Sequence, residues 1–468
     1  MRHFGKPEEV SHMSRKLSAP LLNMANAVTR IFRKNSNDIP VPHIHSREHH
    51  QISRKHISRA ALDVLYGLHK AGYDAYLVGG ALRDMLTGSE PKDFDVVTNA
   101  TPEQARDIFR RSRIIGRRFR LVHVMFGRDM IEVSTFRAHN REDDQAGHSL
   151  NDEGLILRDN AYGTIEEDAL RRDFTINALY YNIANFALYD FVGSLKDIER
   201  KQIRMIGDPE QRYREDPVRM LRAARFAAKL GFDMAAETEK PVRPLATLLY
   251  QVPSARLFDE VLKLFLTGHA HASFASLQRY SLFDVLFPET GKRLHDSDQR
   301  HIWQKLIEQA AINTDARIAQ QKPVTPAFLY AVLLWPSVHT RLEKHLAKGV
   351  PYAPAMAKAA GQVLNEQIKV TSIPKRFSTA MREIWDFQGR LDNRHGRRAE
   401  ALMEHPRFRA AYDFLLLREH AGEIAPGLGD WWTHYQQADS VEKEQLVRSL
   451  GQQSGGAKRR RRRPPRQT

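Results

Sequence analysis

The chain has 468 residues, of which 42% are hydrophobic and none is cysteine. The lack of cysteine excludes disulfides and thiolate metal sites, and the lack of a long apolar run predicts no membrane span. Lysine and arginine outnumber aspartate and glutamate by 72 to 56, a net charge of +16. We therefore expect a cytoplasmic protein with a polyanionic partner. Nucleic acid is the leading candidate, and a merely basic protein is the alternative.

Residues 1–56 are predicted to form a basic N-terminal extension. Residues 10–37 contain no acidic side chain and mix cations such as Arg15 and Arg33 with apolar residues. This pattern fits a flexible extension best, although an amphipathic surface helix or a transit-like segment would have a similar amino-acid composition. The histidines that follow, His43, His45, His49 and His50, are expected to be solvated loop residues and not a metal site.

The next stretch predicts a phosphate-binding turn. Residues 57–71 have helical spacing, and they lead into a predicted strand, Leu77-Val78, and a Gly79-Gly80 turn that opens a helix. Such a turn leaves backbone N–H groups free to hold a phosphate at the positive end of a helix.

Two carboxylates follow in the segment Asp93-Phe94-Asp95-Val96-Val97. On a strand, residues two apart project from the same face, so Asp93 and Asp95 would lie together while Phe94 points into the core. Paired carboxylates beside a phosphate-binding turn predict a site for Mg²⁺ and a nucleoside triphosphate. The alternative is a loop aspartate followed by a helix cap.

A helix capped by Thr101 is expected to run to about Arg111, and a strand pair is expected at residues 121–126 and 130–136. Glu132 alternates with apolar Ile131 and Val133, so it is a candidate third metal ligand. An ordinary solvent-facing strand residue explains Glu132 about as well.

The remaining elements complete the predicted organisation. Residues 138–160 are expected to be a mobile loop, residues 175–183 and 186–192 a hairpin, and the chain from about residue 208 almost entirely helical, with breaks near Pro253, Pro288, Pro323, Pro336 and Pro374. The predicted units are residues 57–195 as a mixed α/β head, 196–260 as a helical neck, 261–450 as a helical body with an RNA-binding region, and 451–468 as a disordered arginine-rich tail.

Two short charged segments are candidates for nucleotide contacts. The Arg172 guanidinium could bind phosphate oxygens, and the Asp173 carboxylate could accept hydrogen bonds from ribose hydroxyls. An internal salt bridge would account for these two residues equally well. Asp216-Pro217 resembles an N-cap followed by proline at the first helical position, and it places Arg219 and Arg222 on one helical face. Asp and Arg together can read an adenine edge, whereas the alternative is a capped helix with a Glu215–Arg219 pair.

In this order, Gly-Gly-x-x-Arg-Asp, Asp-x-Asp, Arg-Arg-Asp-Phe-Thr-Ile-Asn and Glu-Asp-x-x-Arg resemble the class II template-independent nucleotidyltransferases, densely over residues 60–230. This superfamily contains bacterial poly(A) polymerases and CCA-adding tRNA nucleotidyltransferases. The resemblance implies an α+β fold, with a DNA polymerase β-like head and mixed sheet followed by all-helical neck and body domains.

The resemblance also implies roles for the motif residues. Asp93, Asp95 and Asp173 would be the catalytic acids, and two Mg²⁺ ions would be held by Asp93, Asp95 and, least securely, Glu132. The residues expected to bind the nucleotide are Gly79, Gly80, Arg83, Arg172, Asp216, Arg219 and Arg222.

Features other than the shared head motifs favour one branch of the superfamily. The segments 116–127, 373–376 and 405–413, the N-terminal extension and the arginine-rich tail all resemble bacterial poly(A) polymerases. The resemblance implies addition of AMP from ATP to RNA 3′ ends, in RNA decay and processing, with RNA and RNA-decay proteins as partners. The alternatives are a CCA-adding enzyme and an RNA-binding module with a decayed head, and the second is disfavoured because Asp93 and Asp95 are both present.

Overall fold

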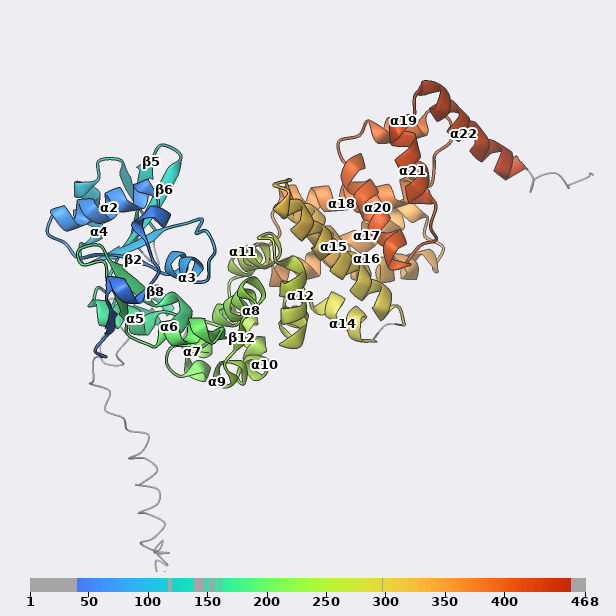
Figure 1. The fold of residues 1–468 in the computed structure, drawn as a ribbon. Coiled ribbons are helices and arrows are strands. Elements are labelled where there is room, and N and C mark those ends of the chain that lie inside the picture. The colour runs from blue at the N-terminus through green and yellow to red at the C-terminus, as the bar shows by residue number, and fades with distance from the viewer. Residues whose placement is uncertain are drawn as a thin grey trace, which may run out of the picture.

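The computed structural model describes residues 40–116, 120–138, 148–150, 156–159, 161–296 and 298–455. A head with a mixed sheet lies at one end, and the helices that follow extend away from it toward the C-terminus (Figure 1). The predicted α+β class is therefore confirmed. Among the described helices, none is long and apolar enough to cross a membrane.

The head is built on an eight-stranded sheet of order β1-β10-β9-β2-β3-β6-β5-β4. Strands β3 and β6 pair in parallel, whereas the other neighbouring strands pair antiparallel. The strands are β1 His43–His45, β2 Ala75–Val78, β3 Asp95–Thr98, β4 Ser112–Ile115, β5 Leu121–Phe126, β6 Asp129–Thr135, β9 Leu179–Asn182 and β10 Leu188–Asp190.

Helices cover both faces of this sheet. Alternate residues of each strand point to opposite faces, so Leu77 and Val96 join one apolar cluster while Val78 and Val97 join another. Helix α2 (Arg59–Lys70) packs on the first face, and α5 (Ile165–Arg171) packs on the second through Ala169. The remaining head helices are α3 Gly80–Leu86, α4 Pro102–Ile108, the 3₁₀ turn η3 Thr175–Asn177 and α6 Ser194–Glu199.

The helical part shares its core with the head. One buried apolar cluster continues from the head to α18 and α20, and a second cluster joins the same two helices to the last helices around Trp432. The helices are α7 Pro209–Glu215, α8 Val218–Leu230, α9 Ala236–Glu239, α10 Val242–Leu245, α11 Ser254–Phe265, α12 Ala270–Arg279, α13 Leu282–Leu286, α14 Pro288–Asp296, α15 Arg300–Ala319, α16 Pro326–Leu346, α17 Tyr352–Val370, α18 Lys375–Arg390, α19 Arg398–Met403, α20 Phe408–Ala421, α21 Leu428–Gln437 and α22 Ser440–Gly455.

Several element predictions were wrong in detail. The helix capped by Thr101 ends at Ile108, because residues 112–115 form strand β4. Two short strands, β7 (His148–Leu150) and β8 (Ile156–Asp159), lie within the predicted loop 138–160. Residues 175–177 form a 3₁₀ turn before the confirmed β9–β10 hairpin. The predicted helical region is interrupted by a pair of short parallel strands, β11 (Gln202–Ile203) and β12 (Asp233–Met234).

Pro336 does not break a helix, contrary to the prediction. It lies inside α16, and both it and its neighbour Trp335 are buried in the body. Proline in a helix interior costs about 3 kcal/mol through a lost hydrogen bond and a steric clash. The burial of α16, in which twelve residues are buried, offsets this cost.

Part of the predicted N-terminal extension is folded onto the head. Strand β1 adds to the sheet edge by pairing with β10, and the short 3₁₀ turns η1 (Arg47–His49) and η2 (Arg54–His56) follow it. His50, predicted to be a solvated loop residue, is buried, and its Nε2 donates to the Phe186 carbonyl oxygen at 3.0 Å. Residues 1–39, 117–119 and 456–468, on which other predictions fall, lie outside the described residues.

Candidate active site

The predicted phosphate-binding turn joins β2 to α3. Gly79 has φ +74° and ψ −137°, a conformation that is essentially restricted to glycine, and it caps the N-terminus of α3. A Cβ atom on Gly79 would lie 3.8 Å from both Arg172 Nη1 and Asp95 Oδ2. The turn therefore lies between a cation and a carboxylate, which are the two kinds of group that a metal-bound triphosphate contacts.

The sheet places Asp95 beside Glu132. Asp95 begins β3, and its register partner on the parallel strand β6 is Glu132. Although Asp95 is exposed at the surface, partial desolvation of its carboxylate by the atoms around it, followed by repulsion from Glu132, raises the pKa of Asp95 to about 6. Desolvation also raises the pKa of Glu132. A divalent cation would relieve this repulsion, so the donor set fits Mg²⁺.

Asp93 lies just before the strand and is exposed, whereas Phe94 is buried as predicted. Asp93 is close enough to Asp95 for its charge to contribute to the raised pKa of Asp95. Among the described residues, no three Asp, Glu, His or Cys side chains converge as a ready metal site. Mg²⁺ is commonly held by one or two carboxylates together with substrate phosphates, so two protein ligands are sufficient.

Arg172 links this region to the head core. Its Nε donates to the Tyr180 hydroxyl at 2.8 Å, and its Nη2 donates to Asp168 Oδ2 at 3.0 Å. Asp168 and the Tyr180 hydroxyl raise the pKa of Arg172 and outweigh its burial. Arg212 on α7 donates to the carbonyl oxygens of Arg171 and Arg172 at 2.6 and 2.8 Å. The guanidinium of Arg172 is thus held in place beside Gly79.

Arg83 is mainly engaged inside the protein. Its side chain is buried, its Nε and Nη2 donate to Asp84 Oδ1, and its Nη1 donates to Asn177 Oδ1 at 2.6 Å. Asp84 also accepts from Lys229 on α8 at 3.2 Å. A phosphate at the turn would have to share the Arg83 donors with these internal partners.

The two charged segments meet in one pocket. Asp173, Asp216, Arg219 and Arg222 all line a cavity of about 330 Å³ at the junction of the head with α8 and α11. Arg222 Nε donates to Asp173 Oδ2 at 2.6 Å. The fold thus brings together four residues that were candidates from the sequence. Asp173 also forms a salt bridge inside the protein, which was the equal alternative for this residue.

The Asp216 carboxylate has a different main partner from the one predicted. It accepts from the Val218 N–H at 3.3 Å, but Pro217, and not Asp216, is the N-cap of α8. Two nitrogens of Arg256 on α11 donate to Asp216 at 2.8 and 2.7 Å. Arg219 is buried, and it donates to Glu215 at 2.9 Å, which is the pair that the alternative interpretation of this segment expected, and to the Arg212 carbonyl at 2.7 Å.

Several residues that shape this site were not predicted from the sequence. Arg256, Asp259, Glu260 and Lys263, all on α11, line the same pocket. Asp168 and Arg212 hold Arg172. None of these residues belongs to a local motif, because each acts through a contact with a distant part of the chain. The clustering of charges on the otherwise apolar helix α11 was the one available signal.

Comparison with known proteins gives matches to three families along the chain. "Poly A polymerase head domain" matches residues 75–204, "Probable RNA and SrmB- binding site of polymerase A" matches residues 231–294, and "Polymerase A arginine-rich C-terminus" matches residues 348–467. The first match covers the sheet except β1, the second covers α9 to α13 and most of α14, and the third covers α17 to α22.

Individual proteins similar to this chain are poly(A) polymerases and, over a shorter stretch, CCA-adding enzymes. Poly(A) polymerase I of Salmonella typhi is 49% identical over 410 residues, which cover 86% of this chain and 88% of the relative. Poly(A) polymerase I of Haemophilus influenzae is 44% identical over 403 residues, which cover 85% and 88%. The CCA-adding enzyme of Bacillus pumilus is 37% identical over 239 residues, which cover 51% and 58%.

Among solved structures, the Bacillus stearothermophilus CCA-adding enzyme in complex with CTP has a TM-score of 0.51 and 25% identity, and the match covers 83% of this chain and 82% of that one. A further CCA-adding enzyme in complex with CTP has a TM-score of 0.55 at 18% identity, covering 84% and 88%. The second match shows the fold alone.

Proposed function

The chain belongs to the poly(A) polymerase family, and from this we propose that it adds AMP from ATP to RNA 3′ ends without a template. The observation that carries the proposal is 49% identity to a poly(A) polymerase I over 86% of the chain. The arrangement of Gly79, Asp95, Glu132 and Arg172 supports it, because it offers carboxylates for a metal and a cation for phosphate at one place.

Asp93, Asp95 and Glu132 are the residues that would hold Mg²⁺. When bound, two such ions would supply Lewis-acid stabilisation of the attacking and leaving oxygens in phosphoryl transfer. The raised pKa of Asp95 and its closeness to Glu132 support this assignment, because the nearby Arg172 and Arg137 do not offset the desolvation of the two carboxylates, and a bound cation would. Gly79 and Gly80 would receive the triphosphate at the start of α3.

The chain's own residues would orient the substrate. Arg172, fixed by Asp168 and Tyr180, lies where it can contact a phosphate beside Gly79. Arg83 would contribute a contact only by sharing its donors. The pocket lined by Asp173, Asp216, Arg219 and Arg222 would take the ribose and adenine, with the base read by carboxylate and guanidinium groups.

The main alternative is CCA addition to tRNA. The head motifs do not separate the two activities, but the CCA-adding relative of Bacillus pumilus covers about half of this chain whereas the poly(A) polymerases cover most of it. The arginine-rich C-terminal match also favours RNA substrates in general, because cations outside the head can bind phosphates of any sequence. Association with RNA-decay proteins and a cytoplasmic location stay predictions from the sequence.

A primer-extension assay tests the proposal. The full chain would be incubated with Mg²⁺, a non-tRNA oligonucleotide and each nucleoside triphosphate in turn, and the products would be resolved on a gel. We expect long ladders with ATP alone. Addition confined to tRNA that stops after three nucleotides would establish the alternative, and no addition to either RNA would contradict both.

A further inference from the structure

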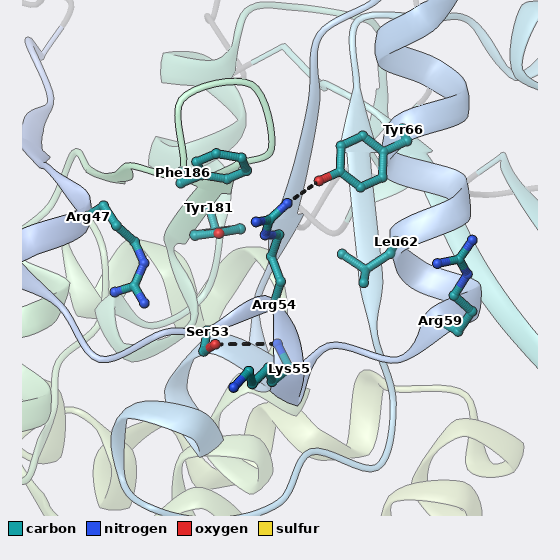
Figure 2. A pocket seen from close by; sticks show the side chains of 9 residues that line it. All are labelled: Arg47, Ser53, Arg54, Lys55, Arg59, Leu62, Tyr66, Tyr181 and Phe186. Atoms are coloured by element: carbon teal, nitrogen blue, oxygen red, sulfur yellow. Dashed lines mark hydrogen bonds between the residues drawn. The ribbon is translucent and has the colours of Figure 1, made fainter.

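A second pocket, of about 430 Å³, lies on the head away from the candidate active site. It is formed by the folded residues 47–55, by α2 and by the β9–β10 hairpin (Figure 2). None of its lining residues belongs to the candidate active site. It is strongly cationic, because four of its nine lining residues are Arg47, Arg54, Lys55 and Arg59 and none is acidic.

Strand alternation places this pocket on the opposite face of the sheet from Asp95. Tyr181, which lines the pocket, joins the same apolar cluster as Leu77, on the face that α2 covers. Asp95 lies two residues before Val97, which belongs to the cluster on the other face. The pocket is therefore not an extension of the nucleotide site.

Three of the cations are available for an anionic ligand. Arg59 pairs with Asp63 at 3.0 Å, but in the described part of the chain no acidic side chain pairs with Arg47, Arg54 or Lys55. All three are exposed at the surface. Cations gathered without an acidic partner repel one another, and the binding of an anion relieves this repulsion.

Aromatic side chains stand beside these cations. Arg54 Nη1 donates to the Tyr66 hydroxyl at 2.8 Å, and the Arg54 guanidinium lies over the Phe186 ring, with Cζ 4.5 Å from the centroid. Figure 2 shows Arg54 between Tyr66 and Phe186, with Arg47 and Lys55 nearby. Guanidinium planes and partly exposed aromatic rings are surfaces on which nucleic-acid bases stack without regard to sequence.

We propose that this pocket is a nucleotide-binding site, in which Arg47 and Lys55 hold a phosphate and the base stacks on the surface formed by Arg54 and Phe186. The ligand is a nucleotide of single-stranded RNA or a free mononucleotide, since both present the same phosphate and base. The site goes beyond the proposed AMP addition and does not depend on it, because the argument uses only the pocket's charge and aromatic side chains.

The test compares the full chain with an Arg47→Ala/Arg54→Ala variant, and both are measured without Mg²⁺ so that no nucleotide is consumed. A matched control, Lys70→Ala/Lys196→Ala, removes the same charge from exposed positions of α2 and α6 outside the pocket. Fluorescence anisotropy with labelled oligo(A) of about 20 nucleotides would be recorded at several salt concentrations. Equilibrium dialysis with AMP would give the number of bound mononucleotides.

If RNA is the ligand, we expect the pocket variant to bind oligo(A) roughly tenfold more weakly at physiological salt and its salt slope to flatten by about 0.7 per lost phosphate contact. A Phe186→Leu variant should bind several-fold more weakly with an unchanged slope, since it removes stacking and no charge. If a free mononucleotide is the ligand, oligo(A) binding stays unchanged and the number of bound AMP molecules falls by one. Oligo(A) and AMP binding equal to those of the control variant would overturn the proposal.

Discussion

Arg222 on α8 donates to the Asp173 carboxylate at 2.6 Å, and this ion pair joins the head to the helical part at the cavity that Asp173, Asp216, Arg219 and Arg222 line. Asp173 also accepts from the Phe174 N–H at 2.8 Å. Arg222 and these hydrogen bonds outweigh burial and lower the pKa of Asp173 to about 2. The contact should therefore stabilise the folded protein less as the pH falls.

Because the pKa of Asp173 is about 2 in the folded protein and 3.8 in its ordinary state, its ionised form favours folding above pH 3.8. This contribution is lost as the pH falls toward 2, and it amounts to about 2 kcal/mol when complete. Asp173→Asn should remove it. The free energy of unfolding, measured by denaturant titration from pH 2 to 6, should differ between wild type and variant most at pH 5 to 6 and less as the pH falls. A difference that does not vary with pH would contradict this role.

Gly79→Ala should impair activity beyond its effect on stability. Gly79 has φ +74°, and a Cβ there would approach Arg172 and Asp95, whereas Gly88 has φ +77° and nothing within 4 Å. Each alanine should cost about 1–3 kcal/mol of stability through backbone strain. Thermal unfolding checks this expectation. When equal amounts of folded protein are compared, only Gly79→Ala should lower kcat/KM for ATP. An equal loss of kcat/KM in Gly88→Ala would show that backbone strain alone is responsible.

Asp93→Asn or Asp95→Asn should abolish AMP addition while the fold and RNA binding survive, because neutral amides hold divalent ions poorly. Primer extension at saturating Mg²⁺ and anisotropy with oligo(A) measure the two properties. Asp107→Asn, which changes an exposed aspartate on α4 paired with Arg106, is the control. Wild-type turnover in either the Asp93 or the Asp95 variant would show that the substituted residue does not hold the metal.

Arg219→Ala should relax the preference for ATP more than it weakens triphosphate binding. The side chain lines the cavity that we propose takes the ribose and adenine. Loss of a charged hydrogen bond to the base should cost about 1.5–3 kcal/mol, or roughly tenfold or more in the kcat/KM ratio of ATP to CTP. Arg256→Ala, which removes the two hydrogen bonds from Arg256 to Asp216, should act in the same direction. The control is Arg214→Ala, because Arg214 is exposed and forms an ion pair with Glu210. An unchanged preference would exclude base reading by Arg219.

Deleting residues 458–468 removes seven cations, Lys458, Arg459 to Arg463 and Arg466. If most of them contact phosphate, the salt slope of RNA binding should flatten by roughly 0.7 per lost contact, with near-normal turnover at saturating RNA. Affinity measured at several salt concentrations checks this expectation. Identical slopes for the full and shortened chains would leave the tail without a phosphate-binding role.

The sequence by itself determined the local elements of the site. Glycine at position 79 is required by a backbone conformation that other residues rarely adopt, and the Thr101 cap follows from side-chain hydrogen bonding within one turn. The alternation around Phe94 and Glu132 indicated which side chains point inward. These features depend on residues a few positions apart, so spacing alone reveals them.

Only the tertiary structure decided which of these elements meet. The parallel pairing of β3 with β6 places Glu132 beside Asp95, and α11 brings Arg256 to Asp216, forty positions earlier in the chain. Burial of α16 keeps Pro336 within a helix despite its local preference. Strand β1 likewise forms because β10 offers it a free sheet edge. Such contacts depend on the packing of distant segments, which short-range periodicity does not specify.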